Sequence, residues 1–145
     1  MSFTNTLENE MLLHLLNNSD IANIGDATGL RGSTTAGSFY LSLHTASPGE
    51  TGTQSTSETT YTGYARVAVA RTAGGWTITG NSASPTSNVD FGECTAGTAT
   101  ITYVGLGTDS TGTGKLVLYG ALSTSISVAT GVIPRIKTTS TITLD

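Results

Sequence analysis

The segment Ser38-Phe-Tyr-Leu-Ser-Leu-His44 decides the fold class, because the hydrophobic pattern changes its period here. Phe39, Leu41 and Leu43 alternate with other residues, and a period of two is typical of a strand with one buried face. Before this segment the apolar spacing is helical. After it, every apolar segment is short and strand-like. The pattern therefore predicts an all-β chain preceded by one helix.

Further strand-like segments follow without a helical stretch between them. They lie at residues 64–71, 76–79, 89–91, 98–106, 115–122, 126–128 and 139–144. The polar segments 45–60 and 80–88 are predicted loops. About eight short strands without a βαβ rhythm favour an antiparallel sandwich or barrel. Eight is the jelly-roll number, and an immunoglobulin-like sandwich is the alternative. We predict a single domain over 1–145, with the helix in 1–19 and a jelly-roll-like β-sandwich over 38–145.

The N-terminal segment has the spacing of an amphipathic helix of about 12 residues. Apolar residues recur at positions 3, 7, 11 and 15 and at positions 12 and 16. Asn5 and Glu8 have the spacing of a capping box, and Thr4 is the alternative N-cap. The apolar stripe must be covered, either by the chain's own sheet, which we expect, or by a partner.

The composition excludes several classes of protein. The chain has 145 residues, of which Thr, Ser and Gly contribute 29, 16 and 18, and the formal net charge is −4. Six Lys and Arg residues are too few for a nucleic-acid binder. No apolar run approaches the ~20 residues of a membrane span, and no signal peptide is expected. A single cysteine, Cys94, forbids an internal disulfide and is consistent with assembly in a reducing cytoplasm.

No group of residues has the spacing of an active site. His14 and His44 have no neighbouring ligand residues, and no serine lies in a G-x-S-x-G motif. Cys94 has no basic neighbour that would lower its pKa. The sequence therefore predicts a protein that is not an enzyme and that holds no cofactor and no metal.

Surface contacts remain as the expected mode of action. Long loops rich in hydroxyl groups provide adaptable hydrogen bonding, and tyrosines next to such loops suit half-wet interfaces. Our interface candidates are Leu12, Leu16, Pro48, Glu50, Tyr61 and Tyr64.

The chain resembles a family of short phage virion proteins, and the similarity covers nearly all of residues 5–145. It is carried by "LENEMLLHLL", "FYLSLHTASPGETGTQ", "YTGYARVAVAR" and "ATITYVGLGTDSTGTGKLVLYGAL". The most specific parts are residues 43–52 and 63–67. Members of this family are often labelled tail-fibre or minor structural proteins. The chain also looks like the jelly-roll cement proteins that decorate short-tailed phage capsids.

The resemblance implies a protein on the outer surface of the capsid, assembled in the host cytoplasm, that bridges major capsid protein subunits as a homodimer. We expect the N-terminal helix or the 45–62 loop to touch the capsid, so that deleting residues 2–16 abolishes decoration. Two alternatives stay open. One is a tail-fibre or tail-tip module that binds a host surface glycan, and the other is a small glycan hydrolase, which needs two carboxylates ~5–10 Å apart.

Overall fold

The computed structural model describes residues 4–21 and 36–144. This part of the chain forms one helix and nine strands. The pairs β1–β6, β6–β7, β3–β4, β4–β9 and β5–β8 are antiparallel, so the all-β fold class with one short N-terminal helix is confirmed. The elements are α1 (Asn5–Asn17), β1 (Ser38–His44), β2 (Val67–Ala70), β3 (Trp76–Thr79), β4 (Ser82–Pro85), β5 (Val89–Asp90), β6 (Ala99–Gly107), β7 (Leu116–Val128), β8 (Arg135–Ile136) and β9 (Ile142–Thr143). None of the described helical residues belongs to a segment long and apolar enough to cross a membrane.

The chain divides into two compact units, which are described separately. The first unit comprises Met1–Ser38, Val69–Asn88 and Lys137–Asp145, and the second comprises Phe39–Ala68 and Val89–Ile136. The prediction that both belong to a single domain stays a prediction.

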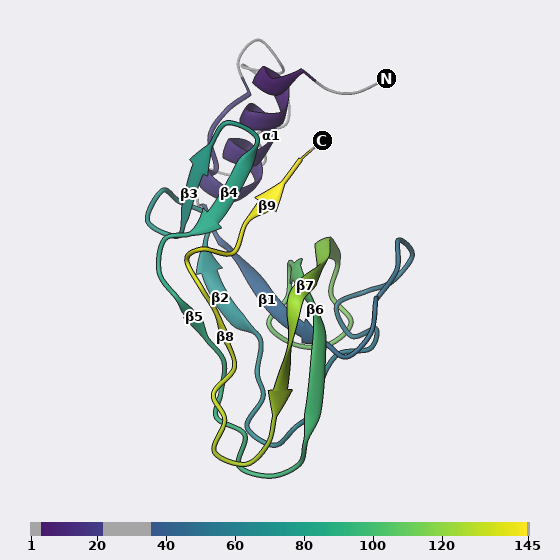
Figure 1. The fold of residues 1–145 in the computed structure, drawn as a ribbon. Helices are drawn as coiled ribbons and strands as arrows, with labels where there is room; N and C mark the ends of the chain where they lie inside the picture. Colours follow the sequence, from purple (N-terminus) through teal and green to yellow (C-terminus); the bar gives the residue numbers. More distant parts are fainter. Residues whose placement is uncertain (1–3, 22–35, 145) are drawn as a thin grey trace. The chain divides into compact units, whose positions relative to one another are not determined.

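In the first unit, α1 packs on a small antiparallel sheet of order β3-β4-β9 (Figure 1). Leu12 and Leu16, one helical turn apart, are fully buried, and Trp76 at the start of β3 is 2 % exposed. The chain's own sheet thus covers Leu12 and Leu16 of the helix stripe, as expected, whereas Leu7, Met11 and Leu15 are half-buried. The N-cap is Thr4, whose hydroxyl accepts a hydrogen bond from Leu7 N at 3.3 Å. Of the two predicted caps, the alternative is the one observed.

An arginine that directly follows β2, Arg71, binds the C-terminal end of α1. Asn18 adopts the left-handed conformation that commonly ends a helix. The Arg71 guanidinium donates hydrogen bonds to the carbonyl oxygens of His14 and Leu15. A cation at this position satisfies free carbonyls and opposes the negative end of the helix dipole.

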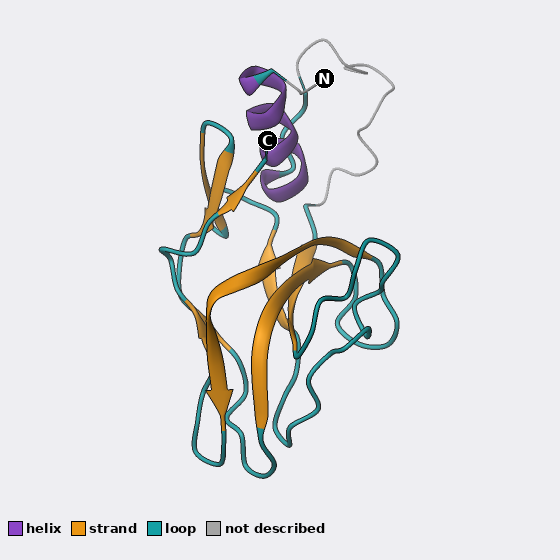
Figure 2. Ribbon diagram, turned by 45° about the vertical axis from the view of Figure 1, so that its right-hand side comes forward, coloured by secondary structure: helices purple, strands orange, loops and turns teal. Residues whose placement is uncertain are grey.

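The second unit is built on β1, β6 and β7, which belong to a sheet of order β2-β1-β6-β7, together with the β5–β8 pair. Leu41 and Leu43 of β1 lie opposite Leu106 and Val104 of β6 on one face of the sheet. Leu41, Leu43 and Leu106 are at most 4 % exposed, so this face forms the core. Figure 2 shows β7 bending midway along its length, where its pairing with β6 shifts register.

The structure differs from the predicted loops and strands at several places, and three of these differences have a clear physical reason. Residues 80–88, predicted to be a loop, contain β4, whose small residues show no apolar alternation and which is stabilised by pairing with β3 and β9. The separate strand predicted at 126–128 is the end of β7, which continues through a bulge. The strand predicted at 64–71 is limited to β2, because the side chains of Tyr64 and Arg66 form hydrogen bonds with Glu58 in the long loop.

Candidate functional site

Two loops of the second unit come together beside β1 and β6. We call residues 45–62 and 108–114, with Tyr64 and Arg66 between them, the loop cluster. The first loop is the long polar loop that the sequence predicted, and the second is the Gly- and Thr-rich connection between β6 and β7.

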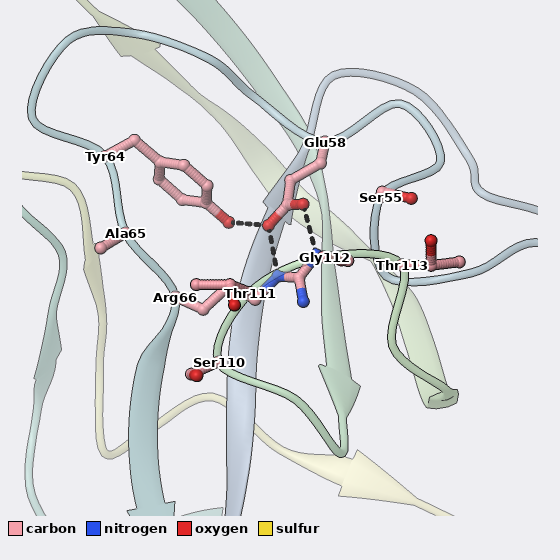
Figure 3. A pocket seen from close by; sticks show the side chains of 9 residues that line it. All are labelled: Ser55, Glu58, Tyr64, Ala65, Arg66, Ser110, Thr111, Gly112 and Thr113. Atoms are coloured by element: carbon pink, nitrogen blue, oxygen red, sulfur yellow. Dashed lines mark hydrogen bonds and ion pairs between the residues drawn. The ribbon is translucent and has the colours of Figure 1, made fainter.

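Arg66 joins the two loops. Its Nε and Nη2 donate to Oε1 and Oε2 of Glu58, each at 2.7 Å, and its guanidinium also donates to the carbonyl oxygens of Asp109 at 3.0 Å and Gly112 at 2.7 Å (Figure 3). The side chains of Arg66 and Glu58 are only 4 % and 14 % exposed. The hydrogen bond to Glu58, more than its charge, raises the pKa of Arg66. A two-pronged pair of this kind fixes orientation as well as distance.

Tyr64 connects this ion pair to the sheet. Its hydroxyl donates to Glu58 Oε1 at 2.7 Å and accepts from Leu43 N at 3.1 Å. Burial, and then the hydrogen bond to the carboxylate, raise the pKa of Tyr64. Its ring stacks on Phe91 at 6.2 Å and contacts the ring of Tyr61 edge-on at 5.4 Å.

A buried glutamine fixes the second loop. The Gln54 side chain is fully buried, and its amide makes two hydrogen bonds with the backbone of Asp109, through Oε1 at 3.0 Å and Nε2 at 3.3 Å. A Cβ atom on Gly107 would lie 2.1 Å from Gln54 Cδ, so the glutamine fits only because β6 has a glycine there. A Cβ atom on Gly114, whose φ is +55°, would likewise lie 2.1 Å from Gln54 Oε1.

His44 fixes the first loop in the same way. Its Nδ1 donates to the carbonyl of Thr56 and its Nε2 accepts from Ser42 Oγ, both at 2.8 Å. Burial lowers the pKa of His44 from 6.5, although the bond to Thr56 acts in the opposite direction. A Cβ on Gly105 would lie 2.6 Å from His44 Nε2. Ser42 and His44 are both fully buried, so this serine–histidine pair is closed to a substrate.

Above the Arg66–Glu58 pair lies a shallow hollow of about 470 Å³. Its rim consists of exposed small and hydroxyl-bearing residues, and its floor consists of the three hydrogen-bonded side chains drawn at the centre of Figure 3. The lining residues are Ser55, Glu58, Tyr64, Ala65, Arg66, Ser110, Thr111, Gly112 and Thr113. The hollow therefore offers a ligand many hydroxyl groups around a floor that is already fixed by hydrogen bonds. It contains a single carboxylate.

The six interface candidates differ in burial. Leu12, Leu16, Pro48 and Tyr61 are buried, Tyr64 is half-buried, and Glu50 is exposed. Tyr64 is part of the hollow, and the Tyr61 hydroxyl donates to the carbonyl of Gly92 at 2.9 Å. The interface role of all six stays a prediction, but Leu12 and Leu16 already serve as core residues.

The residues that organise the loop cluster were missed from the sequence. Arg66 fell within the predicted strand 64–71, and Gln54 fell within the predicted loop 45–60. A signal was present in Gly105-Leu-Gly107, since glycines at alternate strand positions mark a close approach of another segment.

Within residues 4–21 and 36–144, no three His, Cys, Asp or Glu side chains gather in a way that could hold a metal ion. Cys94 is free and fully buried, and its Sγ faces the carbonyl oxygens of Ala96 and Gly97 at 3.4 and 3.5 Å.

The described residues thus form a β-rich protein of antiparallel sheets, with long loops fixed by buried hydrogen bonds. The model of the family described as podophage GP4 fiber I protein gp80 matches residues 2–144. The chain belongs to this family. It is therefore a structural protein of a short-tailed phage and a component of the virion, which confirms the resemblance to phage virion proteins. No curated protein matches the chain.

Proposed function

We propose that this chain belongs to the fibre apparatus of a short-tailed phage and binds a host surface glycan through the hollow of the loop cluster. The family description, which names a fibre protein, supports the location. The observation that carries the binding role is the buried Arg66–Glu58 pair, which fixes two hydroxyl-rich loops before any ligand arrives. Preorganised loops lose less conformational entropy on binding, which favours weak polar ligands such as sugars.

The same geometry supports binding over catalysis. Glycoside hydrolysis by the common mechanism needs two carboxyl groups on either side of the scissile bond. Glu58 is the one carboxylate that lines the hollow, and its oxygens already accept hydrogen bonds from Arg66 and Tyr64. We therefore infer that the protein is not an enzyme and acts through its surface.

Glycan binding is tested with the purified chain and surface polysaccharide extracted from the host of the phage. We expect titration calorimetry to detect binding, and the double variant Ser110→Ala, Thr111→Ala to weaken it by about tenfold, since each lost hydrogen bond contributes roughly 0.5–1.5 kcal/mol. Thr77→Ala, an exposed hydroxyl on β3, is the matched control and keeps wild-type affinity. Equal binding by all three proteins would contradict this site.

Capsid decoration is a second candidate, and one observation favours it. The two segments that carry the resemblance to phage virion proteins most specifically, residues 43–52 and 63–67, meet in the loop cluster, where Leu43 N donates to Tyr64 Oη at 3.1 Å. If this surface has the role that the resemblance to cement proteins implies, it bridges major capsid protein subunits.

The number of copies per virion separates the two candidates. A fibre component follows the symmetry of the tail, so quantitative mass spectrometry of purified particles should give about a dozen or a small multiple of it. A cement protein follows the capsid lattice and is present in hundreds of copies. Hundreds of copies, located on the shell in averaged particle images, would replace the fibre proposal by the decoration proposal.

A further inference from the structure

The strand β7 is the longest described strand, and almost none of it is buried. Of its 13 residues only Val128 is buried, whereas five of the seven residues of β1 are. Residues 116–122 form the most apolar stretch of the chain, yet none of them is buried. A Cβ on Gly120 would meet nothing within 4 Å. Apolar strands normally bury at least one face, so β7 is incompletely covered.

The position of β7 in the sheet leaves its backbone open as well. It is the last strand in the order β2-β1-β6-β7, and no other described strand pairs with its outer edge. Such an edge presents unpaired N–H and C=O groups to a further strand. Edges are commonly protected by charged side chains or proline, and β7 has neither. The pairing of β7 with β6 shifts register near residues 122–125 and again near residue 117, which leaves the straight run at 118–121 open.

The region around β7 also lacks charge. Residues 116–134 contain no charged side chain, although the protein carries 16 charged residues and a net charge of −4. The large apolar side chains that the described chain exposes most, Tyr119 at 39 % and Ile133 at 52 %, both lie in this stretch. Exposed apolar groups and missing charge therefore coincide with the open edge.

We propose that β7 is the interface between two copies of this chain, whose β7 strands pair antiparallel about a two-fold axis. In an antiparallel pair of identical strands the residues at the two-fold axis meet their own copies, so a charge there would face its like at close range. A charge-free strand avoids that repulsion. An unrelated partner of an acidic protein would gain from complementary charges, and β7 offers none. The pairing makes one continuous sheet from the two four-stranded sheets.

The size of the contact sets the expected strength of the dimer. A stable interface commonly buries about 800 Å² per partner from 20–30 residues. The straight run of β7 and its neighbours provide fewer, so we expect a dissociation constant in the micromolar range. This inference does not depend on the fibre role, because it concerns a different surface from the hollow.

The test is sedimentation equilibrium of the full chain over a wide concentration range. We expect a monomer–dimer equilibrium, and we expect Tyr119→Lys to raise the dissociation constant about tenfold or more, because it brings two like charges into an uncharged contact. Ala68→Lys adds the same charge to β2 at the other edge of the sheet and is the matched control. It should dimerise like the wild type.

Hydrogen exchange of the wild type gives a second measurement that needs no variant. Amides within residues 118–121 should become protected as concentration rises through the dissociation constant, while those of β1 stay unchanged. A monomer at all concentrations, a trimer, a dimer unaffected by Tyr119→Lys, or protection that is independent of concentration would each overturn the proposal. Glycan binding by a protein that stays monomeric would leave the fibre role intact and reject this interface.

Discussion

At the scale of single residues, His44 couples the stability of the second unit to pH. Thr56 O accepts from Nδ1, so the neutral ring must accept at Nε2 from Ser42. Protonation would turn Nε2 into a donor inside a fully buried site. The structure therefore favours the neutral imidazole, which agrees with the lowered pKa.

We predict that stability falls as the pH drops below 6.5. The pKa of His44 is lower in the folded protein than in the unfolded chain, so the unfolded chain binds more protons below pH 6.5. The stabilisation is complete above that pH and is lost toward the folded pKa, with a slope of at most about 1.4 kcal/mol per pH unit. Urea unfolding at several pH values should show this slope in the wild type and in His14→Gln but not in His44→Gln. A slope that survives in His44→Gln would refute the assignment.

Arg66 organises the loop cluster, and its loss should be costly. Arg66→Met leaves the mostly buried Glu58 carboxylate without its cation and frees the carbonyls of Asp109 and Gly112. We expect a loss of about 2–4 kcal/mol in the free energy of unfolding, measured by urea titration followed by circular dichroism. Arg135→Met, which breaks the half-exposed pair with Asp90, is the control and should have a much smaller effect. Equal losses would show that the Arg66 pair is no more than a surface contact.

Gly107 shows why this cluster was hard to predict. Gly107→Ala places a methyl group 2.1 Å from Gln54 Cδ and should displace the buried amide, at a cost of about 1–3 kcal/mol. Gly120→Ala on the neighbouring strand meets open space and should change stability little. Thermal unfolding compares the two. The sequence shows the glycines and a polar loop, but it cannot show that Gln54, 53 residues earlier, fills the space above one of them.

At the scale of elements, strands with alternating apolar residues were predicted well, and strands without this alternation were not. The strands around Ser38–His44, Trp76–Thr79 and Ala99–Gly107 have alternating apolar residues, and they form where expected. β4 and the two-residue β8 have no such pattern. β4 pairs with the adjacent β3 and the distant β9, and β8 pairs with the distant β5. The alternation of β1 also indicated one buried face, whereas Ser42 and His44 on the opposite face are buried too, because the 45–62 loop covers them.

The helix α1 gives an element-scale prediction. Leu16 is fully buried where α1 packs against β3 and β4, so Leu16→Ala should lower the free energy of unfolding by about 2–5 kcal/mol. Fluorescence of Trp76, 2 % exposed in the same unit, should report the change. Thr6→Ala on the exposed side of the helix is the control. If Leu16→Ala unfolds like the wild type, the helix stripe is free for a partner, as the capsid-contact hypothesis requires.

At the scale of the whole molecule, the folding of each unit can be followed by aromatic side chains that only that unit contains. The single tryptophan, Trp76, belongs to the first unit, and all five tyrosines belong to the second. The chain passes between the units four times, after residues 38, 68, 88 and 136. Each passage is a peptide linkage that restricts one unit when the other is folded, so the topology favours joint unfolding.

We therefore predict that the two units unfold together, as a single domain would. Tryptophan fluorescence and the NMR signals of the tyrosine rings should follow the same urea transition, because coincident transitions are the mark of two-state unfolding. Leu16→Ala in the first unit and Arg66→Met in the second should each shift both probes equally. If Leu16→Ala moves only the tryptophan transition, the units are independent domains. The loop cluster would then keep its geometry without the helix, and deletion of residues 2–16 would leave the hollow able to bind its ligand.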